Sequence, residues 1–186
     1  PAAKTAMRDY LSAGGRMLAT HYHYTWFKNG EAEFTTLANW DTTSVFATST
    51  TISQAFPKGT ALAEWLQNVG ATTIKGSLNA TDVASDIGRV NAPAQSWMSN
   101  ISGGNESSKQ FSVNTPILAP KANQCGRAVM TDFHVASGAG SDTSLPTQCA
   151  STALSPQERA LEFSLFDLSA CIQDDASTPK APKHTP

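Results

Sequence analysis

Three histidines lie where predicted β-strands end. His21 and His23 directly follow the mostly apolar run 16–20, and His134 closes the run 126–134. In an extended segment, side chains two residues apart point to the same face, so His21 and His23 would face one ligand together. Imidazoles in this arrangement bind a divalent transition metal or form hydrogen bonds with a polar ligand.

The convergence of these histidines depends on how the two strands are arranged. In open parallel sheets, ligands bind beyond the carboxyl ends of the strands. If runs 16–20 and 126–134 are neighbours that run in the same direction, we expect the three imidazoles to share one pocket. Asp132 would then lie on the same side of its strand as His134. The alternative is that the histidines only form structural hydrogen bonds, which is common for an isolated His-x-His pair.

Aromatic residues gather just after the first two histidines. Tyr24, Trp26 and Trp40 lie in a segment with few clear secondary-structure signals. Most aromatic side chains in such a segment form the core beneath a long loop. The alternative is a stacking surface for a sugar ring, and for this role we select Trp26 and Trp40, with Tyr24 as a further ligand contact.

The cysteines bear on the cellular compartment. The chain has three, Cys125, Cys149 and Cys171, and none is at the spacing of a zinc site. They are either buried free thiols of a cytosolic protein or one disulfide with a cysteine left over. We favour the disulfide, because Cys149 lies in a polar loop where a thiol gains little from packing. A bond between Cys149 and Cys171 would tie that loop to the end of the last helix.

Composition excludes two classes of partner. Charged residues make up only 15% of the chain, the formal net charge is −2, and the basic residues are scattered. A nucleic-acid partner is excluded because it requires a concentrated positive face. No apolar run approaches the roughly 18 residues of a membrane span. Few charges and many Ser and Thr residues are common in exported proteins, so we expect an extracellular, periplasmic or cell-surface location.

The order of predicted elements indicates an α/β domain. The helix, Gly-Gly and strand over residues 2–20 make half of a βαβ unit, whose first strand we expect outside this chain. We expect a mostly parallel sheet with helices on both faces, a single domain over residues 1–173 and a disordered tail or linker over 174–186. Helices are predicted over 2–11, 60–69 and 81–90 and after the capping box at 155–158. Strands are predicted over 16–20 (buried on both faces), 50–56, 109–115 (half-exposed) and 126–134.

Two segments carry a resemblance to a known family. Residues 9–21 (DYLSAGGRMLATH) and 125–134 (CGRAVMTDFH) both lead through a Gly-Arg strand to a histidine. They resemble the class I glutamine amidotransferase-like superfamily, in particular its trehalose-utilisation-protein-like branch, as found in surface lipoproteins of myxobacteria. The resemblance implies a flavodoxin-like layered sheet without its N-terminal strands. It does not imply glutamine hydrolysis, because no cysteine has the context of the nucleophile and Ala136 stands where the family has glutamate.

These observations predict an extracytoplasmic ligand-binding domain of a larger surface protein. Its site would lie at the carboxyl ends of the strands and bind carbohydrate or a metal. The expected metal ligands are His21, His23 and His134, and the expected ligand contacts add Tyr24, Trp26 and Asp132. A metal- or His-dependent hydrolase is the first alternative. A structural or assembly domain without a site is the second.

Overall fold

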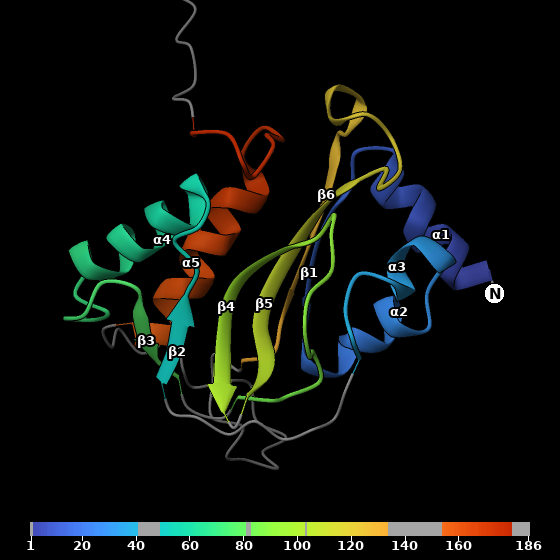
Figure 1. The fold of residues 1–186 in the computed structure, drawn as a ribbon. Helices are drawn as coiled ribbons and strands as arrows, with labels where there is room; N and C mark the ends of the chain where they lie inside the picture. Colours follow the sequence, from blue (N-terminus) through green and yellow to red (C-terminus); the bar gives the residue numbers. More distant parts are fainter. Residues whose placement is uncertain (1, 41–48, 81–82, 103, 134–153, 180–186) are drawn as a thin grey trace, which may run out of the picture.

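The fold is a mixed α/β domain built on a curled six-stranded sheet (Figure 1). The computed structural model describes residues 2–40, 49–80, 83–102, 104–133 and 154–179. The strands are β1 (Arg16–Thr20), β2 (Ser49–Ile52), β3 (Ser77–Asn79), β4 (Gln95–Ser102), β5 (Asn105–Thr115) and β6 (Gly126–Thr131). The helices are α1 (Ala2–Ser12), η1 (His21–His23), α2 (Tyr24–Lys28), α3 (Ala32–Thr35), α4 (Pro57–Asn68), η2 (Lys121–Asn123) and α5 (Pro156–Ser169).

The strand order is β1-β6-β5-β4-β2-β3, and among the described strands only β1 and β6 pair in parallel. The expectation of a mostly parallel sheet is therefore wrong, and the flavodoxin-like layering is not confirmed. The reason is in the connections. A short hairpin joins β4 to β5, and residues 116–125 join β5 to β6 without a crossover helix. Parallel neighbours require a crossover of a dozen or more residues, so these strands pair antiparallel.

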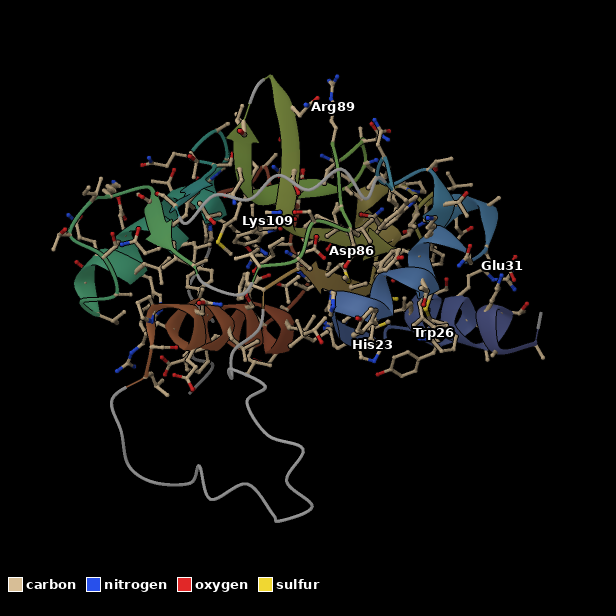
Figure 2. All side chains as sticks on the ribbon, turned by 90° about the horizontal axis from the view of Figure 1, so that it is seen from below. His23, Trp26, Glu31, Asp86, Arg89 and Lys109 are labelled. Carbon is tan, nitrogen blue, oxygen red and sulfur yellow. The ribbon has the colours of Figure 1, made fainter. Side chains whose placement is uncertain are left out.

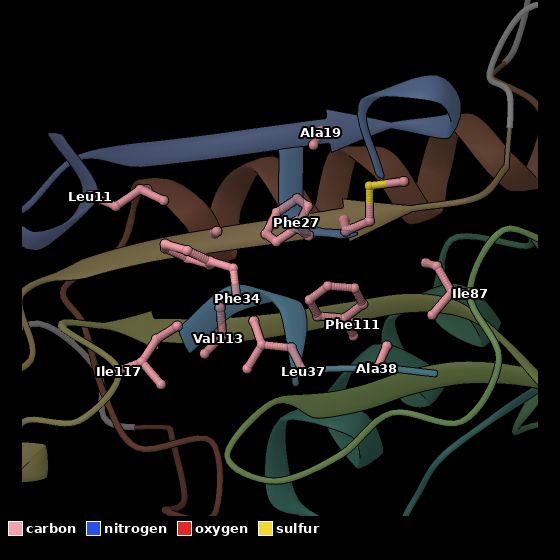
Figure 3. Packing of buried hydrophobic residues seen from close by; sticks show 12 residues of the cluster. Leu11, Ala19, Phe27, Phe34, Leu37, Ala38, Ile87, Phe111, Val113 and Ile117 are labelled. Atoms are coloured by element: carbon pink, nitrogen blue, oxygen red, sulfur yellow. The ribbon is translucent and has the colours of Figure 1, made fainter. Parts of the chain in front are cut away.

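Helices cover both faces of the sheet, as expected. Helices α1, α2 and α3 lie on one face, and α4 and α5 lie on the other (Figure 1). Strand β5 separates the two cores by alternation: Phe111 and Val113 face α1–α3, whereas Gln110 donates a hydrogen bond to Ser164 of α5. Figure 3 shows the first core, in which the ring centroids of Phe27 and Phe111 are 5.4 Å apart.

Several predicted elements are confirmed, and helix α5 shows why. Its first turn has the predicted capping box: Ser155 accepts from the Glu158 N–H, and the Glu158 carboxylate accepts from the Ser155 N–H. Helix α1 and strands β1 and β6 also form at the predicted positions. Helix α4 begins at Pro57, three residues before the predicted Thr60, because proline fits the first helical position.

Three local predictions are wrong. Residues 83–90 form no helix and lack regular structure apart from isolated bridges from Val83 to Phe133 and from Ala38 to Val90. Strand β1 lies at the sheet edge and is mostly half-buried. Strand β5 was expected to be half-exposed but lies inside the sheet with most side chains buried on both faces. Alternation of polar and apolar residues predicts an exposed face only where no second layer covers it.

The packed region extends past residue 173. Asp175 is buried and lies 3.0 Å from an Arg127 guanidinium nitrogen and 3.2 Å from Lys58 Nζ. Asp174 pairs with Lys121. At least the first residues of the segment predicted to be a tail are therefore bound to the sheet and to α4.

Candidate functional site

The predicted site lies at the carboxyl ends of β1 and β6. The two strands pair in parallel, with Thr20 opposite Thr131, so the condition that they are neighbours in the same direction is met. His21 follows Thr20 and Asp132 follows Thr131, so both residues lie just beyond the carboxyl ends of these strands. His134 lies outside the described residues, so the pocket of three histidines stays a prediction.

His21 and His23 do not lie in an extended segment, which corrects the first premise of the prediction. They form the ends of the 3₁₀-helix η1, and His21 has a φ of 41°. Two residues apart in a 3₁₀-helix, side chains point about 120° away from each other. The His21 ring binds Asp86, whereas the His23 ring bends back to the Thr20 carbonyl at 2.7 Å from Nδ1.

His21 and Asp86 form a partly exposed pair. The distance from His21 Nδ1 to Asp86 Oδ2 is 2.9 Å, and the side chains are 23% and 16% exposed. A carboxylate accepts, so Nδ1 carries the proton and Nε2 is the basic nitrogen of the neutral ring. This arrangement orients a histidine for proton transfer or for contact with a ligand. Sequence reasoning missed Asp86, because it placed that residue in a helix far from His21 along the chain.

Asp132 supports the segment that carries Asp86. Its side chain is fully buried, and Oδ2 accepts hydrogen bonds from the backbone N–H groups of Asp86 at 2.9 Å and Ile87 at 3.1 Å. Burial, with the nearby charge of Asp86, raises the pKa of Asp132 to about 7. Oδ1 has no hydrogen-bond partner within the described part of the chain. The described hydrogen bonds of Asp132 are thus made to the protein backbone, and they hold the segment whose Asp86 contacts His21.

The predicted aromatic residues divide between surface and core. Tyr24 stacks on Trp40 with ring centroids 6.4 Å apart and is packed against the first core. Trp26 is 37% exposed and Tyr22 is 75% exposed. His23 and Trp26 are three residues apart in the continuous helical stretch η1–α2, and Figure 2 shows them close together at the surface. We call Tyr22, His23 and Trp26 the η1–α2 face.

The remaining predicted groups are placed as follows. Cys171 is exposed after α5, but Cys149 lies outside the described residues, so their disulfide stays a prediction. Among the side chains that the structure describes, no group of three or more His, Cys, Asp or Glu residues is placed to hold a metal ion. In the same described ranges, no helix has the length and apolar character needed to cross a membrane.

Comparison with known proteins adds no relative. No protein-family model, no curated protein and no solved structure matches this chain.

Proposed function

We propose that this chain is an extracytoplasmic domain of a larger surface protein that binds carbohydrate on the η1–α2 face. The observation that carries the proposal is the exposed row of Tyr22, His23 and Trp26, beside the His21–Asp86 pair. Aromatic rings stack on the apolar faces of sugars, and imidazole and carboxylate groups form hydrogen bonds with hydroxyl groups. The low content of charged residues supports the extracytoplasmic location, and the two Gly-Arg strands support the kinship with the amidotransferase-like superfamily.

A glycan array, followed by calorimetry on the best glycan, tests this function. We expect Trp26→Ala to weaken binding at least about tenfold, because it removes the largest exposed ring of the face. Tyr10→Ala is the matched control, since Tyr10 is an exposed aromatic residue on α1 outside that face and its loss should leave affinity unchanged. Blank arrays, or equal affinity of the wild type and the Trp26 variant, would contradict carbohydrate binding here.

A second candidate function is hydrolysis, and the His21–Asp86 pair favours it. In this mechanism His21 takes a proton from water as general base, and Asp86 holds the ring in the required tautomer. If the chain hydrolyses a chromogenic glycoside, ester or phosphoester, Asp86→Asn should reduce kcat/KM at least about a hundredfold. Activity that survives a chelator would identify the His-dependent form, and activity lost to the chelator would identify the metal-dependent form. Turnover that is unaffected in the Asp86 variant would argue against both.

A further inference from the structure

A buried lysine lies beneath the segment that carries Asp86. Lys109 of β5 is 1% exposed, and its Nζ lies 2.7 Å from the Ala84 carbonyl. The same nitrogen lies 2.9 Å from Ser85 Oγ and 2.7 Å from Ser107 Oγ. Figure 2 shows Lys109 in the interior of the domain, toward the segment of Asp86. Three polar groups on two segments therefore converge on one amine.

The direction of these hydrogen bonds can be assigned. The Ala84 carbonyl can only accept. Ser107 donates its own hydroxyl proton to the Ile87 carbonyl at 3.0 Å, so Ser107 Oγ accepts from Lys109. A neutral amine has two hydrogens, which these two acceptors satisfy, and one lone pair. The lone pair is then directed to Ser85 Oγ, and Ser85 donates. Lys109 can therefore lose its proton without losing a hydrogen bond.

Burial acts on Lys109 in the direction of the neutral amine. Burial lowers the pKa of Lys109, and the charged groups that oppose this change are Asp132, at the end of β6, and Asp86, on the covering segment. Ser85 is only half-buried, whereas Lys109 and Ser107 are buried. A half-buried serine is thus hydrogen-bonded to a buried amine.

We propose that Ser85 and Lys109 form a nucleophilic serine–lysine dyad that accepts acyl groups from esters or amides. Ser85 Oγ attacks the carbonyl carbon while its proton passes to Lys109 Nζ. The bond to the leaving group then breaks, and Lys109 returns the proton to the alcohol or amine. Water, with its proton taken by Lys109, releases the acid and restores Ser85. This activity goes beyond carbohydrate binding and does not involve His21.

Labelling of the full chain with an alkyl fluorophosphonate tests the dyad. In this reaction Ser85 Oγ bonds to phosphorus, fluoride leaves, and the hydroxyl proton passes to Lys109. Trypsin cleaves after Lys75 and Arg89, so the adduct should appear on peptide 76–89, and fragmentation separates Ser85 from Ser77. We expect no adduct on this peptide in Ser85→Ala and unchanged labelling in Ser77→Ala, a control on β3.

Lysine variants test the base. Lys109→Met should slow labelling about a hundredfold or more. Lys75→Met, which removes a surface lysine paired with Glu64, should not; because it also removes a trypsin site, its adduct is measured on peptide 59–89. Circular dichroism checks that the Lys109 variant is folded. If it is not, the wild-type pH profile decides: the labelling rate should rise with a midpoint below 10.5, the ordinary lysine value. No adduct on Ser85, a folded Lys109 variant that labels at the wild-type rate, or a rate independent of pH would overturn the dyad.

Discussion

Replacing Arg127 with methionine is expected to lower the free energy of unfolding by about 3–5 kcal/mol. Arg127 of β6 is 1% exposed, and one of its terminal nitrogens lies 2.8 Å from Asp167 Oδ2 and 3.0 Å from Asp175 Oδ1. The same nitrogen also lies 3.0 Å from Ser112 Oγ. The variant would leave two buried carboxylates facing a single cation, Lys58, and the uncompensated charge is the source of the loss.

The network around Arg127 is balanced in charge, which is why one substitution should cost so much. Lys58 Nζ lies 2.7 Å from Asp167 Oδ1 and 3.2 Å from Asp175 Oδ1, so two cations face two carboxylates. Ser112 donates to Asp175 Oδ2 at 2.9 Å. The network joins α4, α5, the sheet and the segment after α5, and its disruption should loosen all four.

Urea denaturation of the wild type, Arg127→Met and a control variant measures the change in the free energy of unfolding. Arg159→Met is the matched control, since Arg159 of α5 forms a partly exposed ion pair with Glu162 at 2.9 Å. Its loss should change the free energy of unfolding by no more than about 0.5 kcal/mol. Asp175→Asn combined with Arg127→Met should cost less than the sum of the single substitutions, because both remove the same pair. A loss below about 1 kcal/mol for Arg127→Met would show that the network is not formed in solution.

The second large effect is a pH dependence of stability that Asp132 causes. The pKa of Asp132 is about 7 in the folded chain against 3.8 for an ordinary aspartate, so folding favours the protonated form. The stabilising contribution is complete below pH 3.8 and is lost as the pH rises toward and past 7. Between pH 5 and 8.5 this loss amounts to about 2–3 kcal/mol.

Asp132→Asn isolates this contribution, because its amide oxygen can still accept from the backbone of Asp86 and Ile87. The free energy of unfolding of the wild type, minus that of the variant, should fall by about 2–3 kcal/mol from pH 5 to pH 8.5. Asp174→Asn is the control. Pairing with Lys121 lowers the pKa of Asp174, so this carboxyl is ionised in both the folded and the unfolded chain throughout this pH range. A difference that does not change with pH would mean that Asp132 is already ionised at pH 5.

Parts of the fold follow from the sequence because they depend on local rules. The capping box at Ser155 and the helical spacing of α5 need no distant partner, and both are observed. The apolar runs at 16–20 and from 126 correctly predicted strands β1 and β6, and their parallel pairing meets the condition set for a shared site at their ends. His21 was found because it directly follows one of those strands.

Other features depend on contacts between distant residues. The polar side chains of β5 predicted a solvent-exposed face, but α5 and residues 83–90 cover them, so Gln110 and Lys109 are buried among hydrogen-bond partners. Asp86 is 65 residues from His21 along the chain, and no periodicity marks it as the partner. Likewise, Asp175 looked like the start of a polar tail until Arg127 and Lys58 were seen beside it.

The sequence by itself determined where α1, β1, β6 and α5 begin and which strand end carries His21, since helix caps and apolar runs act over a few residues. Only the tertiary structure decided the strand directions, the divergence of His21 from His23 and the buried clusters around Lys109 and Arg127. The physical reason is that a buried polar side chain is stable only with partners, and chain folding supplies those partners from segments far apart in sequence.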